Sequence, residues 1–243
     1  MQIIGTILII FSVADFALSW VGINLTPFLP PALATFSPII IGSIGAFILQ
    51  ASTETIGHKT QLINSLLSTY KINTHYKNIA LVLFGTLLLT ISSKVQVPFW
   101  PVPMTMQTFI VFIIGMAYGW RLAFFTLVAY LIEGALGLPV FAKGGGLLYL
   151  IGPTAGYLYG MVIAAGVIGF LAERGCNDSY IKSLISLIIG TVIIFVLGVG
   201  FLGSVIGYDK ALAGGLYPFI PSEFFKIGLA VILIPSITRY INK

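Results

Sequence analysis

Long apolar runs recur along the chain and are separated by short polar segments or by segments rich in Gly and Pro. A helix that crosses a bilayer needs about 20 mostly apolar residues, and strand-like alternation at period two is absent. The pattern therefore predicts a bundle of transmembrane helices. We expect helices at 3–23, 33–51, 78–96, 104–119, 121–137, 152–172, 181–206 and 221–241.

The longest polar segment, residues 52–77, divides this pattern into two parts. Two helices within residues 1–51 form a hairpin ahead of it, and six helices follow in residues 78–243. We therefore predict an all-α polytopic membrane protein with an N-terminal hairpin, a polar cytoplasmic linker and a six-helix domain. The run at 104–119 is short for a crossing, which suggests a helix that is tilted or packed inside the bundle.

Composition supports the membrane class. Hydrophobic residues make up 58% of the chain and charged residues only 8%, whereas soluble domains carry roughly a quarter charged residues. The net charge of +5 does not indicate nucleic-acid binding, because the basic residues are scattered at helix ends. The one cysteine, Cys176, excludes an internal disulfide and a multi-cysteine metal site. The first helix lacks a basic leader and a clear cleavage site, so we read it as retained.

The distribution of basic residues predicts the orientation, because cytoplasmic loops carry an excess of Lys and Arg. With a cytoplasmic N-terminus, eight basic residues lie on the cytoplasmic side and three on the opposite side, while Lys226 falls inside the last helix. We therefore predict a multi-pass protein of the cytoplasmic membrane with both termini in the cytoplasm. The eight are Lys59, Lys71, Lys77, Arg121, Arg174, Lys182, Arg239 and Lys243, and the three are Lys94, Lys143 and Lys210.

Three loops then face outward, at 94–103, 138–152 and 207–220, and they are rich in Gly and Pro. Irregular backbone at membrane depth is tolerated only where protein buries it or where it lines a cavity. This favours a ligand pocket at the outward end. Tight connections between helices are the alternative.

An acid and a base lie at i, i+3 in the last predicted helix, Glu223 and Lys226, and this spacing puts both on one face. Pro221 suits the start of the helix and Ser222 is a plausible capping residue. Glu223 then lies in the first turn, where the helix dipole favours a carboxylate. The pair can present acceptors and donors to a polar ligand. A simple intrahelical ion pair at the membrane surface is equally compatible with the spacing.

Several other polar or aromatic residues are candidates for the pocket. Glu133 either snorkels outward or joins a polar pocket floor, while Asp15 in the first helix favours a structural role. Gln107 at a helix start can cap or contact a ligand. Tyr157 offers a ring with a polar tip. Trp100 fits an interfacial belt or a loop that closes a pocket.

No set of nucleophile, base and orienting residue emerges, so we predict neither an enzyme nor a cofactor or metal site. His58 and His75 both lie in the polar linker. The sequence Lys143-Gly144-Gly145-Gly146 has the glycines of a phosphate cradle but lacks the G-x-x-x-x-G-K-[ST] pattern.

Four ordered segments resemble motifs of one family, BioY, the biotin-specific S components of energy-coupling factor (ECF) transporters. Residues 97–109, VPFWPVPMTMQTF, resemble its P-V-P-x-T-x-Q signature, and residues 134–141, GALGLPVF, resemble G-x-x-G-L-P-V-F. Residues 152–158, GPTAGYL, resemble G-P-T-G-G-Y, and residues 218–226, PFIPSEFFK, resemble P-F-x-P-G-D-x-x-K. Together they cover about residues 78–243.

The resemblance implies a six-helix S-component fold with an outward biotin pocket covered by loops. It implies high-affinity biotin binding and uptake across the cytoplasmic membrane, with a membrane T component and two ATPase subunits as partners in the lipid bilayer. It assigns biotin binding to the positions of Glu223 and Lys226. We expect Glu223 to accept a ureido N–H, and Lys226 or Lys143 to meet the carboxylate. The full set of expected biotin-binding residues is Glu223, Lys226, Tyr157, Gln107, Lys143, Gly145, Trp100 and Glu133.

The sequence departs from the family pattern at several points. Ser222 and Glu223 replace Gly-Asp, Ala155 replaces a Gly, and residues 1–77 have no counterpart in the minimal family unit. The Ala-x-x-x-Ala spacing that S components use to meet the T component is interrupted by Phe84. Two alternatives stand beside the biotin interpretation. One is an S component for another small vitamin, and the other is a stand-alone secondary transporter that moves protons on an intramembrane carboxylate. No inverted repeat is evident between the two halves, which disfavours the secondary transporter.

Overall fold

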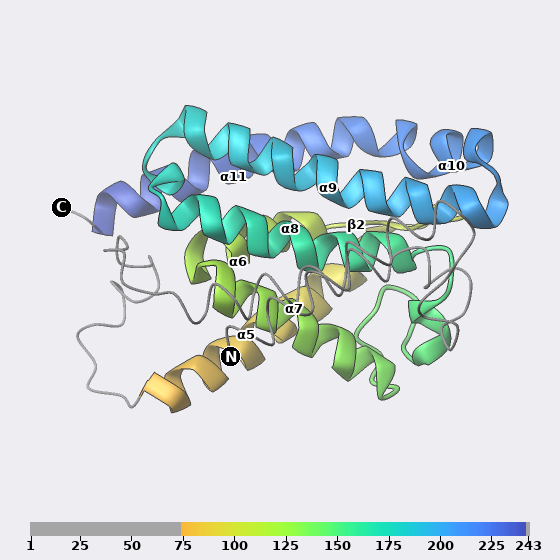
Figure 1. Cartoon of the computed structure of the whole chain (residues 1–243), viewed down its shortest axis with the longest axis horizontal. Helices are drawn as coiled ribbons and strands as arrows, with labels where there is room; N and C mark the ends of the chain where they lie inside the picture. Colours follow the sequence, from red (N-terminus) through yellow and green to blue (C-terminus); the bar gives the residue numbers. More distant parts are fainter. Residues whose placement is uncertain (1–73, 242–243) are drawn as a thin grey trace, which may run out of the picture. The chain divides into compact units, whose positions relative to one another are not determined.

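The computed structural model describes residues 74–241, which fold into a helical bundle (Figure 1). Its long helices are α5 (Thr74–Lys94), α8 (Ala155–Glu173), α9 (Tyr180–Ile206) and α11 (Ile220–Ile241). Within the described residues, four segments are long and apolar enough to cross a membrane, Tyr76–Lys94, Ala155–Glu173, Tyr180–Ile206 and Tyr208–Thr238. The predicted all-α membrane fold is confirmed for this part of the chain. The expected hairpin at 1–51 and nearly all of the linker at 52–77 lie outside the described residues.

Two shorter helices follow α5, namely α6 (Gln107–Tyr118) with 12 residues and α7 (Trp120–Ala135) with 16 residues. At 1.5 Å per residue they span about 18 and 24 Å, less than the hydrocarbon core of about 30 Å. Gly119 alone separates them, at a positive φ of 75° that favours glycine. Most residues of α6 are buried, which agrees with the second of the two alternatives that the sequence offers for this short run, packing inside the bundle.

Helix α8 lies at the centre of the bundle and packs against α9, α6 and α7. Helix α11 contacts α9 and α6, and helix α5 contacts α7 and α6. Figure 1 shows α9, α10 and α11 together, with α8 between them and the α5–α7 helices. Glycines such as Gly160 of α8, whose Cβ would lie 2.8 Å from the Ile194 Cα of α9, allow the two backbones to approach closely.

The loops that are predicted to face outward contain more regular structure than the sequence predicts. Strands β1 (Gln96–Val97) and β2 (Met104–Thr105) pair antiparallel, and the turn between them holds a cis Trp100–Pro101 peptide bond. The helix expected from residue 104 therefore begins at Gln107. The second loop contains an isolated bridge between Phe141 and Gly144, followed by the 3₁₀ turn η1 (Leu147–Leu150).

The expectation of an irregular loop at 207–220 is wrong. This segment forms helix α10 (Tyr208–Gly215) and the 3₁₀ turn η3 (Tyr217–Phe219), which lead directly into α11. Ser222, expected to cap α11, is the third residue of that helix, because the 3₁₀ turn continues into it. Glu223 lies in the first turn, as predicted. On the other side of the bundle η2 (Cys176–Asp178) joins α8 to α9.

The three predicted outward loops gather at one end of the bundle. The Lys94 ammonium donates to the Phe141 carbonyl at 2.6 Å, which joins the first loop to the second. A Cβ on Gly214 of α10 would lie 2.8 Å from Cδ of Pro101, which joins the first loop to the third. This shared end is where the sequence predicts a pocket.

Candidate functional site

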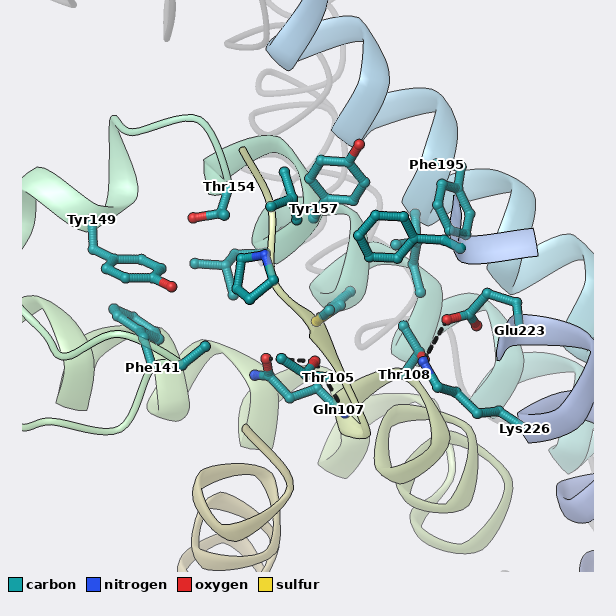
Figure 2. Close-up of a pocket in the computed structure, with 17 residues that line it drawn as sticks. Thr105, Gln107, Thr108, Phe141, Tyr149, Thr154, Tyr157, Phe195, Glu223 and Lys226 are labelled. Carbon is teal, nitrogen blue, oxygen red and sulfur yellow. Dashed lines mark hydrogen bonds and ion pairs between the residues drawn. The ribbon is translucent and has the colours of Figure 1, made fainter. Parts of the chain in front are cut away.

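A pocket opens among α6, α8, α9 and α11, beneath the first two loops of this shared end (Figure 2). Its empty volume, including the open mouth, is about 520 Å³. The lining is Val102, Pro103, Thr105, Gln107, Thr108, Phe141, Ala142, Tyr149, Thr154, Tyr157, Leu158, Met161, Ile194, Phe195, Phe219, Glu223 and Lys226.

Three polar side chains from α6 and α11 meet at one end of this pocket. The Lys226 ammonium donates to Oε1 of Glu223 at 2.7 Å and to the Thr108 hydroxyl at 3.1 Å. That hydroxyl in turn donates to the same carboxylate oxygen at 2.9 Å. Figure 2 shows the group at the ends of α6 and α11. Glu223 is 4% exposed and Lys226 is 2% exposed, so this is a buried ion pair and not a surface one.

The buried pair is not saturated by the protein. Oε2 of Glu223 is buried and has no hydrogen-bond partner among the described residues. Lys226 uses two of its three ammonium hydrogens on Glu223 and Thr108. A buried carboxylate oxygen without a partner carries a desolvation penalty. The site thus offers one strong acceptor and one charged donor side by side to a molecule in the pocket.

Aromatic rings form two of the pocket walls. Tyr157, Phe195 and Phe219 pack together with ring centroids 6.0–6.5 Å apart. On another side Phe141 stacks on Tyr149 at 4.8 Å and meets Tyr130 edge to face at 5.4 Å. Such rings enclose apolar ligand groups and fix their orientation by shape.

Gln107 is held in the lining by hydrogen bonds at both ends of its amide. Its Nε2 donates to the Tyr130 hydroxyl at 2.9 Å, and that hydroxyl donates to the Val140 carbonyl at 2.8 Å. Its Oε1 accepts from the Thr105 hydroxyl at 3.1 Å. Because the Tyr130 hydrogen is engaged by Val140, the Gln107 atom facing Tyr130 is the NH₂ group. One Nε2 hydrogen remains available to a ligand.

Tyr149 and Thr154 add polar groups to the pocket on the side away from Glu223 (Figure 2). Burial is the largest influence on the Tyr149 hydroxyl and raises its pKa, while hydrogen bonds with the Thr154 side chain and the Lys143 backbone oppose that shift. The hydroxyl therefore stays neutral at physiological pH and can donate. Among residues 74–241 no three His, Cys, Asp or Glu side chains gather as a metal cluster would require.

Four of the eight sequence-predicted site residues line the pocket, namely Gln107, Tyr157, Glu223 and Lys226. Tyr157 lies there differently from the expectation of a polar tip toward the ligand. Its hydroxyl donates to the Gly215 carbonyl at the end of α10, at 2.8 Å. The ring alone is thus available to the pocket.

The other four predicted residues lie outside the lining. Trp100 is 74% exposed, in the turn next to the lining residues Val102 and Pro103. Lys143 is exposed on the turn that the Phe141–Gly144 bridge closes. A Cβ on Gly145 would overlap the Leu138 carbonyl, so that glycine serves close packing. Glu133 is half-buried on α7.

Sequence reasoning missed several residues of the lining. Thr108 bonds to both Glu223 and Lys226, yet in the sequence it is only the residue after Gln107. Phe195 lies in the middle of a long apolar run, where nothing distinguishes it from lipid-facing neighbours. An apolar residue in a membrane helix carries no signal of whether it faces lipid or ligand, so these positions needed the fold.

Comparison with known proteins places the chain in a family. The family model described as BioY matches residues 63–243. A probable biotin transporter BioY of Pyrococcus horikoshii is 35% identical over 158 residues, which cover 65% of this chain and 93% of that relative. The biotin transporter BioY of Thermotoga maritima is 37% identical over 150 residues, covering 61% and 88% respectively.

A solved structure shares the fold. It is the S-component for biotin from an ECF-type ABC transporter, with a TM-score of 0.60 and 24% sequence identity. The match covers 71% of this chain and 95% of that chain. The fold predicted from the four sequence motifs is therefore confirmed, and the chain belongs to the BioY family.

Proposed function

We propose that this protein binds biotin and is the substrate-specific subunit of an ECF transporter that takes biotin up across the cytoplasmic membrane. The observation that carries the proposal is the buried pair of Glu223 and Lys226, which presents a carboxylate oxygen without a partner beside an ammonium. Relatives that match over about nine-tenths of their own length are biotin transporters, and the bundle has the fold of an S component for biotin.

The chemistry of biotin fits this end of the pocket. Its ureido group has two N–H donors and a carbonyl acceptor in one plane. Oε2 of Glu223 accepts a ureido N–H, which provides the partner that this buried oxygen lacks in the protein. The third Lys226 hydrogen donates to the ureido carbonyl. The pair thus recognises a donor next to an acceptor. A molecule with only one of these groups leaves one member of the pair without a hydrogen bond.

The rest of the ligand fits the rest of the lining. The aromatic wall of Tyr157, Phe195 and Phe219 packs on the apolar thioether ring and tail. The valerate carboxylate then reaches the side with Tyr149 and Thr154, where neutral hydroxyls donate to it. Lys143, on the adjacent exposed turn, supplies a positive charge near the mouth.

Uptake requires partners and an orientation in the membrane. The proposal includes a T component and two ATPase subunits, and places both termini in the cytoplasm with the pocket facing outward. Residues 78–243 form the biotin-binding unit, with the segments at 52–77 and 1–51 as a cytoplasmic linker and an additional hairpin. Accessibility labelling of the single Cys176 supplies a test of orientation, since it lies on the cytoplasmic side in this arrangement.

The direct test is equilibrium dialysis of the purified protein in detergent against radiolabelled biotin. We expect saturable binding at one site, displaced by unlabelled biotin and desthiobiotin, which retain the ureido group. Thiamine and riboflavin are not expected to compete. Displacement by another vitamin and not by biotin would assign the S component to that vitamin. Biotin uptake in a host without any T component or ATPase subunit would make the protein a stand-alone transporter.

A Tyr157→Phe variant is expected to bind biotin about three- to tenfold more weakly than the natural protein. The ring remains, but the Gly215 carbonyl loses its donor, and an intramolecular hydrogen bond contributes about 0.5–1.5 kcal/mol. Equilibrium dialysis measures the change. Tyr159→Phe is the matched control, because Tyr159 lies outside the lining and donates to Leu150 instead. An unchanged affinity in Tyr157→Phe would show that α10 is held without this bond.

A further inference from the structure

Three side chains at or just beyond the end of α5 donate to three consecutive carbonyls of the second loop, residues 138–152. Two of them lie in α5 and the third in β1. The Ser93 hydroxyl lies 2.8 Å from the Val140 carbonyl and shares its one hydrogen with the Thr90 carbonyl of its own helix, at 2.7 Å. The Lys94 ammonium donates to the Phe141 carbonyl at 2.6 Å. The Gln96 amide donates to Ala142 at 3.2 Å. Residues 93–96 are thus in register with residues 140–142, and we name this set of three bonds the α5 clamp.

The clamped segment is a wall of the pocket. Phe141 and Ala142 both line it, and the fully buried Phe141 ring stacks on Tyr149. The Val140 carbonyl also accepts from Tyr130, which holds Gln107 in the lining. A shift of residues 140–142 therefore changes the position of three lining side chains at once.

This wall differs from most of the lining in how its backbone is held. The lining residues of α6, α8, α9 and α11 belong to helices, whose backbone groups bond within the helix. Residues 140–142 are not helical, and their internal support is the small bridge from Phe141 to Gly144. The lining residues Val102 and Pro103 are also non-helical, in the turn that leads into β2. The position of the wall at 140–142 therefore depends on contacts from other segments, of which the α5 clamp is one.

We propose that Lys94, together with Ser93 and Gln96, is a positioning residue that holds the Val140–Ala142 wall closed and thereby sets how long a bound ligand stays. The identity of the ligand rests on the proposed function, whereas the geometry of the α5 clamp does not depend on it. Lys94 contributes most, because its bond is the shortest of the three and is charge-assisted. The ligand itself does not contact Lys94, which lies outside the lining.

The competing explanation is a local one. Lys94 lies in the last turn of α5. A positive charge there interacts favourably with the helix dipole, and this explanation gives Lys94 no role in the pocket. The two explanations differ in where the structure loosens when the charge is removed. Loss of the clamp loosens residues 137–146, whereas loss of a helix cap loosens the last turn of α5.

The test measures both the wall and the ligand in the full-length protein in detergent. Hydrogen exchange read by mass spectrometry reports the wall without ligand, and biotin dissociation reports retention. For Lys94→Met we expect faster exchange in residues 137–146, unchanged exchange in α8, and dissociation about tenfold faster, since a charge-assisted bond is worth roughly that factor. Lys94→Arg keeps the charge and the donors and is expected to restore both. Lys182→Met, exposed at the start of α9, is the matched control.

Gln96→Leu provides a second variant should Lys94→Met fail to fold, and a smaller change in the same direction is expected because its bond is neutral and longer. Exchange that quickens only in α5 overturns the proposal, as does a dissociation rate that neither variant changes. If the natural protein binds no biotin, the proposed function fails, while exchange at 137–146 still decides whether the clamp holds the wall.

Discussion

Replacing Glu223 by Leu and Lys226 by Met together is expected to leave a folded protein that no longer binds biotin. Each single replacement leaves the other charge buried without its partner, which destabilises a protein by about 3–5 kcal/mol. The double replacement removes both charges and is often neutral or stabilising. Adding Thr108→Val removes the hydroxyl that the double variant leaves without either partner.

The affinity for biotin responds differently from the stability of the fold, because the ligand loses two polar partners in the double variant. Hydrogen bonds to charged groups contribute about 1.5–3 kcal/mol each, and 1.4 kcal/mol is a factor of ten in affinity. The dissociation constant is therefore expected to rise at least about 100-fold. Thermal unfolding in detergent measures the fold, and equilibrium dialysis with biotin measures the site.

The experiment separates the two readings that the sequence leaves open for this pair. If the two residues were only an intrahelical ion pair, the double variant would fold and still bind biotin with unchanged affinity. Asp209→Asn with Lys210→Met is the matched control, since it removes one adjacent pair of opposite charges from an exposed face of α10. That control is expected to change neither measurement.

The pair itself was predictable from sequence for a physical reason. An ionisable residue in an apolar run is rare, and a spacing of i, i+3 fixes both side chains on one helix face whatever the rest of the fold does. The placement of Glu223 and Lys226 relative to each other therefore follows from their spacing alone. The family resemblance added the expectation of what they bind.

The other half of the site was not predictable in this way, because it depends on contacts between segments far apart in the chain. Thr108 meets Lys226 across 118 positions. The clamp from Lys94 to Phe141 spans 47. Neither residue has a local pattern that marks its partner. Lys143, by contrast, looked suitable because it is a charge in an outward loop, yet it lies on an exposed turn outside the lining.

Two predictions in the loops expected to face outward were wrong, the loop at 207–220 and the helix start at 104, and they have a related cause. The segment at 207–220 contains three glycines and a proline, which favour a loop by composition, yet α10 forms there. Gly207, at a positive φ of 87°, turns the chain before the helix, and Gly214 lets it approach Pro101. Met104 and Thr105 continue an apolar pattern but pair with β1. In both places a tertiary contact overrides the local tendency.

Gly198→Ala is expected to weaken biotin binding by at least about tenfold and to destabilise the protein. A Cβ at this position would overlap the Tyr157 ring. That ring has no free direction, since Phe195 and Phe219 pack beside it and its hydroxyl is tied to Gly215. Inserting a methyl group into a packed interior costs about 1–3 kcal/mol. Because Tyr157 lines the pocket, the displaced ring takes space from the ligand.

Gly200→Ala, two residues further along α9, is a control of the same chemistry. A Cβ there meets nothing within 4 Å, and Ala is intrinsically favoured over Gly in a helix by about 1 kcal/mol. That variant is therefore expected to bind biotin normally and to be as stable as the natural protein or more so. Equal effects of the two substitutions would attribute the change to helix α9 as a whole and not to the contact with Tyr157.

A double-mutant cycle locates the effect at that contact. In a Tyr157→Ala background the ring is gone, and Gly198→Ala then has nothing to overlap. Its further effect on biotin affinity is expected to shrink to within a factor of about two, because residues in direct contact are non-additive while independent sites add. An undiminished effect in that background would place the damage elsewhere in the packing of α8 against α9. The glycine would then act on the approach of the two helices, and the pocket would be affected only as a consequence.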